Sequence, residues 1–163
     1  FFFASDTPDG TNRGGAMFQA STNERANLHL SCTGTADNSL IVFNNGNGTV
    51  GTVRVNGSAT AFNTSSDYRL KENVDYSWDA TTRLKQLKPA RFNFIADDTN
   101  TLVDGFLAHE VSSIVPEAIS GVKDEVDKDG KPEYQGIDQS KLVPLLVKTI
   151  QELEARIKTL EDA

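Results

Sequence analysis

Hydrophobic and polar residues alternate in short runs along the first 65 residues, and Asn-Gly pairs separate the runs. The alternation is clearest at residues 26–31 (ANLHLS) and 49–55 (TVGTVRV). A period of two is typical of strands with one buried face, and Asn-Gly is a favoured hairpin turn. The pattern therefore predicts short strands, tight turns and no helix in residues 1–65.

Residues 1–65 contain few large apolar side chains, so a sheet built from them alone buries little surface. Such a sheet gains too little from burial to offset the lost chain entropy. Packing against identical neighbours would supply the missing burial. We therefore expect this segment to be the end of a longer, oligomeric β-structured fibre.

After residue 65 the pattern mixes helical and strand periods. The expected elements are helices at 81–87 and 108–115 and strands at 91–95 and 103–107. Val111, Ile114 and Val115 fall on one stripe of the second helix. This mixture predicts an α+β domain over residues 66–163.

A longer helix is expected over about residues 140–161, with Pro144 tolerated near its first turn. Its apolar residues recur at intervals of three and four: Val143, Leu146, Ile150, Leu153, Ile157 and Leu160. This spacing is an a/d heptad seam. The seam either joins helices of several copies or packs on its own domain, and Ile at a with Leu at d leans toward dimers in isolated coiled coils.

The charged stretch 122–134 has an Asp-Gly pair near its centre, which predicts a solvated hairpin or mobile loop. Four of its residues imitate the opening of an EF-hand calcium loop: Glu125, Asp127, Asp129 and Gly130. The first ligand, however, is Glu, and Gly136 stands at the twelfth position, where a bidentate Glu is required. We therefore expect neither a metal nor another cofactor.

Composition narrows the classes of function. The 163 residues, 37% hydrophobic and 24% charged, suffice for one globular core and an extended segment. The net charge is −7, and most of the acidity lies after residue 65. Because a negative surface repels phosphate backbones, we expect no nucleic-acid partner.

The apolar runs are too short to cross a membrane, and Phe1–Phe3 is too short for a signal peptide. Because the chain begins with phenylalanine, we expect a piece of a longer protein whose export signal, if any, lies elsewhere. Cys32 is the single cysteine, which excludes an intrachain disulfide and a thiolate metal cage. We expect Cys32 to be a buried thiol in a strand-like stretch.

Ser66 and Lys71 lie in a polar, turn-prone stretch, SDYRLKENV at residues 66–74. A Ser/Lys pair can cut peptide bonds without histidine, because a neutral amine can take the proton of the attacking hydroxyl. A free lysine has a pKa of about 10.4, so this role requires burial that favours the neutral amine. The alternative without catalysis is that Ser66 caps a turn and Lys71 is a surface lysine.

The offset of five between Ser66 and Lys71 separates them on an ideal helix and places them on opposite faces of a strand. Regular structure alone would not bring them together. We therefore expect a turn between them, with Ser66 or Asp67 capping a short helix. The first amides of that helix would face the Ser65 carbonyl as an oxyanion hole.

The run NGSATAFNTSSDYRLKENV at residues 56–74 resembles the junction of the phage tail-fibre and tailspike intramolecular chaperone domain, of the peptidase family S74 type. The similarity covers about residues 56–161, including LKQLKPARFNF at 84–94 and LVPLLVKTIQEL at 142–153. In that family the protein itself cuts the bond before the serine of the Ser-Asp pair. The resemblance implies cleavage between Ser65 and Ser66, with Ser66 as nucleophile and Lys71 as base.

Further site residues follow from the same resemblance. It implies a homotrimer joined through Leu146, Ile150, Leu153, Ile157 and Leu160, and supporting roles for Asp67, Arg69, His109 and Glu110. The block GFLAHEV at 105–111 carries the last two, which would orient the junction or satisfy buried groups; by chemistry alone His109 could also be a triad base. Arg69 either pairs with an acidic neighbour across subunits or is solvated.

The resemblance thus predicts an intramolecular chaperone, residues 66–163, that holds three copies in register while a viral tail fibre or tailspike ending in residues 1–65 folds. It then detaches by self-cleavage. Expected partners are the other copies, the upstream fibre chain and, through the mature fibre, a host surface receptor, without a membrane. The mature part would reside in the virion, and the chaperone fragment would be released in the host cytoplasm.

Two alternatives remain open at this point. One is a permanent trimeric tip that binds a host receptor and is never cut. The other is a membrane-bound transcription factor of the myelin regulatory type, which contains a domain of this kind.

Overall fold

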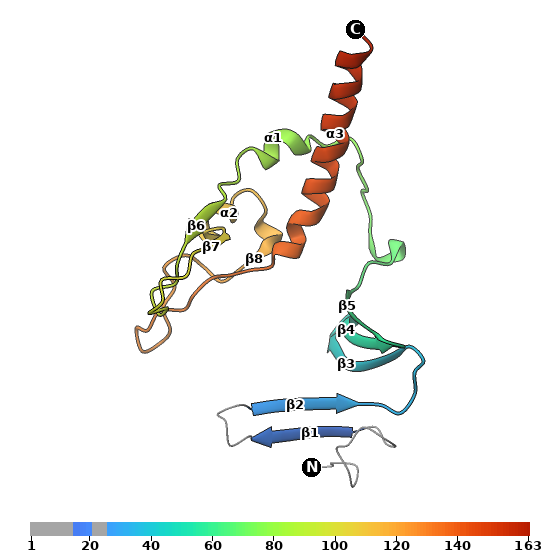
Figure 1. Cartoon of the computed structure of the whole chain (residues 1–163), viewed down its shortest axis with the longest axis vertical. Helices are drawn as coiled ribbons and strands as arrows, with labels where there is room; N and C mark the ends of the chain where they lie inside the picture. Colours follow the sequence, from blue (N-terminus) through green and yellow to red (C-terminus); the bar gives the residue numbers. More distant parts are fainter. Residues whose placement is uncertain (1–14, 21–25) are drawn as a thin grey trace. The chain divides into compact units, whose positions relative to one another are not determined.

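The structure is a computed structural model that describes residues 15–20 and 26–163 (Figure 1). The chain divides into two compact units, residues 1–74 and 75–163. The division expected at residue 65, which marks the cleavage junction, stays a prediction. The apolar start Phe1–Phe3 lies outside the described residues, as do the rest of 1–14 and 21–25 within the expected fibre segment.

The first unit consists of antiparallel strands. β1 (Gly15–Ala20) pairs with β2 (Ala26–Ser31), and a separate sheet has the order β3-β4-β5 (Asn38–Asn45, Gly48–Asn56 and Ala59–Thr64; Figure 1). Gly57 adopts a φ of +56° in the β4–β5 turn, a left-handed conformation that glycine accepts at low cost. Over the described residues of 1–65, the expected strands and turns are confirmed.

The three-stranded sheet of the first unit buries little. All six residues of β5 are exposed, and Phe62 on that strand is 81% exposed. The thin core expected from the sequence is therefore confirmed for the described strands. Burial against identical neighbours remains a prediction.

Cys32 differs from its expected environment. It follows β2 instead of lying within a strand, it is half-buried, and its thiol donates a weak hydrogen bond to the Gly34 carbonyl at 3.4 Å. The prediction of a buried thiol is therefore wrong. The physical reason is that the chain leaves the sheet one residue earlier, at Ser31, so the side chain has no opposing layer to enter.

The second unit is mixed α and β, as the sequence predicts. Its elements are α1 (Ala80–Leu84), β6 (Ala90–Phe92), β7 (Val103–Gly105), α2 (Ala108–Val111), η2 (Pro116–Ala118), β8 (Ile119–Ser120), β9 (Gly136–Ile137), η3 (Gln139–Leu142) and α3 (Val143–Glu161). β6 pairs with β7 and β8 with β9, both antiparallel. The elements before α3 are shorter than their sequence patterns.

A small core joins the elements of the second unit. Its buried residues are Ala80, Val111, Val115, Ala118, Leu142 and Leu145, with Trp78, Leu84 and Phe106 among those packed against them. Val111 and Val115 are each 1% exposed. The apolar stripe predicted for residues 108–115 is therefore part of the core.

The charged loop of the second unit follows the expectation of a solvated hairpin. A single antiparallel bridge joins Val126 and Pro132, and Gly130 takes a φ of +78° at the turn. Asp127 accepts hydrogen bonds from the amides of Asp129 and Lys131. The acidic side chain at the centre of the loop is thus used to shape the turn.

The helix α3 presents two different faces. Leu145 and Thr149 are buried, 2% and 4% exposed, and α1 packs beside α3 (Figure 1). The predicted seam lies elsewhere on the helix and is open, with Ile150 65% and Ile157 55% exposed. Within one chain, α3 therefore packs on its own domain through residues outside the seam.

Candidate active site

Ser66 and Lys71 lie close together in the first unit. The Lys71 Nζ donates a hydrogen bond of 2.8 Å to the Ser66 Oγ. Both residues are exposed. A hydroxyl and an amine at this distance are within reach for proton transfer, although in this arrangement the hydrogen bond runs from the amine to the hydroxyl.

A tight turn brings the two side chains together. Residues Tyr68–Leu70 form the 3₁₀ turn η1, flanked by extended backbone at Asp67 and Lys71. Asp67 caps the turn because its carboxylate accepts a hydrogen bond from the Arg69 amide at 2.9 Å. The expected short helical turn capped by Asp67 is confirmed.

Arg69 forms an ion pair within its own chain. Its guanidinium donates two hydrogen bonds of 2.9 Å to the two carboxylate oxygens of Asp67. The side-chain bond from Arg69, then that from its amide, holds the pKa of Asp67 below its usual value, and the charge of Lys71 acts in the same direction. The sequence offered only a pairing across subunits or solvation; the two-residue spacing instead lets Arg69 fold back across the 3₁₀ turn onto Asp67.

Ser65, on the other side of the candidate scissile bond, is held by the three-stranded sheet of the first unit. Its amide donates to the Val50 carbonyl at 3.1 Å, and its hydroxyl donates to the Thr49 carbonyl at 3.0 Å. Both acceptors belong to β4. The carbonyl side of the bond is thus attached to a strand, whereas the Ser66 side leads into a turn.

The amides of the turn limit what can form an oxyanion hole. The Arg69 amide binds Asp67 Oδ1, the Leu70 amide binds the Asp67 carbonyl and the Lys71 amide binds the Tyr68 carbonyl. These amides are therefore engaged inside the turn. Of the first three helical amides, this leaves that of Tyr68 as the candidate donor toward the Ser65 carbonyl.

Large apolar side chains surround the pair along the chain. Tyr68, Leu70, Val74 and Tyr76 are 81%, 71%, 59% and 82% exposed. Exposed apolar groups at this density are typical of surfaces that become covered on association. Covering them would also remove water from the Lys71 amine.

His109 and Glu110 belong to the second unit, on α2. His109 is exposed, and its carbonyl accepts a hydrogen bond from the Ser112 hydroxyl. Glu110 is half-buried and pairs with the Lys88 ammonium at 3.2 Å. Within the second unit, Glu110 therefore forms a partly exposed ion pair. A role for His109 or Glu110 at the junction stays a prediction.

The described residues contain no group of three or more His, Cys, Asp or Glu side chains arranged to hold a metal ion. In the same part of the chain, none of the helices has the length and apolar content needed to cross a membrane.

Sequence reasoning missed two residues that hold the start of the second unit. Lys148 donates to the Tyr76 carbonyl, and Glu152 binds the first residues of α1. These partners lie about 70 positions away along the chain. The only indication of these contacts in the sequence was that Lys148 and Glu152 lie outside the apolar seam of the helix.

A protein-family model matches part of the chain. Residues 66–120 match the model of the Peptidase S74 family, described as "Chaperone of endosialidase". The match begins at Ser66 and includes the 3₁₀ turn, α1 and α2. No curated protein matches the chain.

Proposed function

We propose that the chain assembles and then cuts itself, starting from the match of residues 66–120 to the chaperone-of-endosialidase family model. In this proposal, residues 66–163 are an intramolecular chaperone that aligns three copies of a viral tail fibre or tailspike. The chaperone then detaches by hydrolysis of the Ser65–Ser66 bond. Ser66 is the nucleophile and Lys71 is its base.

The observation that carries the proposal is the 2.8 Å contact between Lys71 Nζ and Ser66 Oγ. Spacing along the chain does not favour such a contact in a regular helix or strand. The capped turn η1 provides it, and the family match begins at Ser66.

The proposed reaction begins with attack of the Ser66 hydroxyl on the carbonyl carbon of Ser65. The hydroxyl proton passes to the neutral Lys71 amine, the C–O bond forms, and the C–N bond breaks as the Ser66 nitrogen takes a proton and leaves as an amine. The chain is then joined through an ester, which water hydrolyses to a Ser65 carboxylate and a free Ser66 hydroxyl. A tethered nucleophile of this kind can gain up to about 7–11 kcal/mol from proximity.

Assembly supplies what the single chain lacks. Lys71 is exposed and donates to Ser66, whereas a base must be neutral. Desolvation disfavours a charged ammonium. Partner copies that cover Tyr68, Leu70 and Val74 would dry the amine and favour its neutral form, which couples cleavage to completion of the trimer.

The exposed seam of α3 supports association of copies. Leu146, Ile150, Leu153, Ile157 and Leu160 are 43–78% exposed although all are apolar. A helix that leaves such a stripe open gains stability by packing it against partner helices. Ile at a with Leu at d favours a dimer in isolated coiled coils. We propose a trimer instead because the family resemblance implies one.

A chaperone at this position has a physical purpose. Intertwined β-fibres depend on long-range contacts and expose unpaired strand edges while they form. Helices that first bring three chains into register lower the entropic cost of those contacts. Removal of the helices then leaves the fibre kinetically trapped, ready to bind a host receptor on the virion, while the fragment stays in the host cytoplasm.

Mass spectrometry on two variants tests the proposal. Wild-type chain should yield fragments that end at Ser65 and begin at Ser66, while Ser66→Ala and Lys71→Ala should remain intact and still form trimers. Intact wild-type trimers would instead indicate a permanent receptor-binding tip. Cleavage that persists in Lys71→Ala would remove the lysine from the base role.

A further inference from the structure

The face of α3 opposite the seam holds the segment that leads from the candidate active site into the second unit. We call residues 72–79, between Lys71 and α1, the connector. Lys148 Nζ donates a hydrogen bond of 2.9 Å to the Tyr76 carbonyl in this connector. One helical turn further along α3, Glu152 binds Ala80 and Thr81, the two residues that follow the connector.

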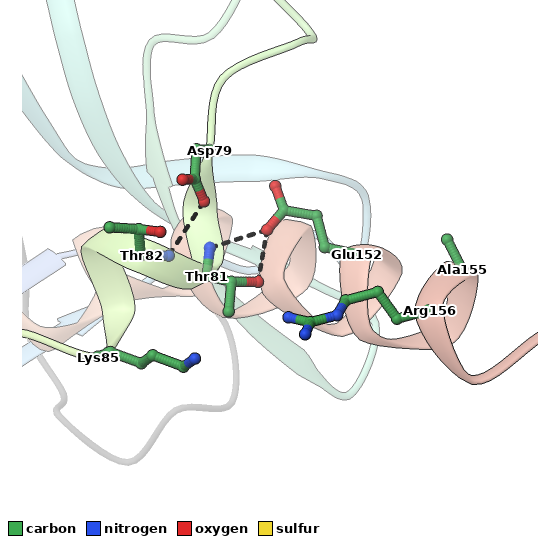
Figure 2. A pocket seen from close by; sticks show the side chains of 7 residues that line it. All are labelled: Asp79, Thr81, Thr82, Lys85, Glu152, Ala155 and Arg156. Atoms are coloured by element: carbon green, nitrogen blue, oxygen red, sulfur yellow. Dashed lines mark hydrogen bonds between the residues drawn. The ribbon is translucent and has the colours of Figure 1, made fainter. Parts of the chain in front are cut away.

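Glu152 uses both carboxylate oxygens. Oε1 accepts from the Ala80 amide at 3.0 Å, and Oε2 accepts from the Thr81 amide at 2.8 Å and from the Thr81 hydroxyl at 2.5 Å. Figure 2 shows the Glu152 carboxylate turned toward Thr81 at the start of α1. Hydrogen bonds to an ionised carboxylate are among the stronger ones in proteins. We call the side chains of Lys148 and Glu152 the clamp.

The surroundings of the clamp keep it ordered. Ala80 is fully buried and Thr81 is 8% exposed, so the backbone that Glu152 grips is part of the core. Asp79 caps α1 through the Thr82 amide at 3.0 Å, and an open hollow of about 400 Å³ beside it is also lined by Lys85 and Arg156 (Figure 2). The end of the connector is thus fixed by Glu152 on α3 and by the Asp79 cap of α1.

The clamp and the seam occupy opposite sides of one helix. Lys148 and Glu152 each lie two residues from Ile150, which places them about 200° around the helix from it. Ile150 is exposed, whereas Lys148 and Glu152 are half-buried. Partner helices can therefore pack on the seam while the clamp keeps its grip.

A short length of chain separates the clamp from the candidate base. Five residues lead from Lys71 to Tyr76, and an extended chain of that length spans at most about 18 Å. The position of Lys71 is therefore limited by the point at which α3 holds the connector. A tether this short limits how far the catalytic turn can lie from the point at which α3 holds the connector.

We infer that Lys148 and Glu152 are positioning residues for self-cleavage, which transmit the placement of α3 in the assembled bundle to Ser66 and Lys71. This inference rests on the proposed self-cleavage and adds the means by which assembly reaches the active site. The clamp fixes where the connector ends, and the length of the connector then limits how far Lys71 can lie from that point. The clamp does not touch the reacting atoms.

The test follows cleavage of the 163-residue chain after cell-free synthesis, with separate measurement of trimer formation. Glu152→Gln and Lys148→Met should each slow cleavage by about tenfold to a hundredfold, the scale reported for misplaced catalytic groups, and should still trimerise. Glu154→Gln and Lys158→Met are matched controls on the same helix and should cleave at the wild-type rate.

An insertion separates positioning from general stability. Gly-Ser-Gly placed between Val74 and Asp75 lengthens the tether and should slow cleavage to a similar extent. Combined with Glu152→Gln it should add little further loss, because the lengthened connector already uncouples the clamp. Losses that multiply in the combined variant would show that Glu152 acts only through stability, and would overturn the inference.

The outcomes also separate this inference from the proposed function. If wild-type trimers cut themselves and both clamp variants cut at the same rate, the clamp role is wrong and self-cleavage stands. If wild-type trimers stay intact, self-cleavage itself is wrong, and the clamp role falls with it.

Discussion

The Lys71 amine donates to the Ser66 hydroxyl in the single chain, whereas the proposed reaction needs proton transfer in the opposite direction. The 2.8 Å distance is already within hydrogen-bond reach, so for these two atoms the proposed reaction requires a change in the charge of the amine. In the proposal, desolvation on assembly provides that change. At the scale of single residues, the proposed cleavage therefore depends on a neutral Lys71 amine.

Lys71→Arg tests this requirement at a single residue. An arginine side chain keeps the positive charge and can still donate to Ser66, but it does not lose its proton in proteins. Cleavage should fall by about 10²–10⁴-fold, the usual contribution of a general base. Fragment yield from assembled trimers measures the effect, and Lys85→Arg serves as the control. Wild-type yield in Lys71→Arg would contradict a base role.

Two substitutions of Asp67 test whether the capped turn is needed for cleavage. Asp67→Ala removes the cap and the ion pair with Arg69, so the turn should populate its closed form less and cleavage should slow several-fold. Asp67→Asn keeps a good cap while losing the charge, and should retain most of the rate. Equal losses in both variants would assign the effect to the ion pair, contrary to this account.

Sequence reasoning reached the Ser/Lys pair through resemblance and not through spacing. An offset of five favours no contact in a regular element, so the sequence predicted a turn between the two residues, and the structure shows that turn with Asp67 as its cap. The Asp67–Arg69 pair was missed because nothing in the pattern indicates that Arg69 folds back across the turn. The sequence therefore predicted the turn but not the ion pair across it, and the chemistry of the Ser/Lys pair stays a prediction.

Among the elements, α3 combines two functions on two faces. Its exposed seam is suited to partner helices, and its buried face holds α1 and the connector. The heptad pattern predicted the first face, because apolar periodicity is a local signal. The second face depends on tertiary contacts with residues far along the chain, which no periodicity records.

Charge placed in the seam should prevent assembly. Ile150→Asp combined with Ile157→Asp puts carboxylates at positions that are 65% and 55% exposed in one chain, so each chain should still fold, but burial of these charges between helices is costly. Sedimentation should show monomers under conditions in which we expect the wild type to form trimers, and cleavage should be lost. Thr159→Asp, which lies outside the seam, should behave as the wild type. Cleavage by the monomeric variant would separate self-cutting from assembly.

Acid should weaken the clamp. The hydrogen bonds from the Thr81 hydroxyl and the Ala80 amide hold the pKa of Glu152 below its ordinary value near 4.5, although the charge of Asp79 opposes them. A depressed pKa contributes stability above the ordinary value that is lost as pH falls through the depressed one. The stability difference between wild type and Glu152→Gln should therefore shrink below about pH 4.5.

Fluorescence of Trp78, the single tryptophan, can follow that unfolding because it packs against the core beside the clamp. Asp79, Lys85 and Arg156 line the same hollow and are present in both proteins, so the difference between the two curves isolates Glu152. A difference that is independent of pH would contradict the role of the ionised carboxylate.

At the scale of the whole molecule, a thin strand unit and a mixed α+β unit share one short connector. The composition shift near residue 65 predicted this change of character, and the short strands and charged loop followed from local patterns. The small size of the core in the second unit did not follow from the sequence, because burial depends on which elements meet. Each unit leaves apolar side chains exposed, which supports association as the state in which the chain functions.

The central claim is that assembly makes the Ser66–Lys71 pair cut the bond before Ser66. Intact-mass measurement of freshly formed wild-type trimers over time, beside monomers of the seam variant, tests it most directly. The account predicts that the trimers convert to two fragments, 1–65 and 66–163, while the monomers remain whole. Trimers that stay whole after prolonged incubation would contradict it.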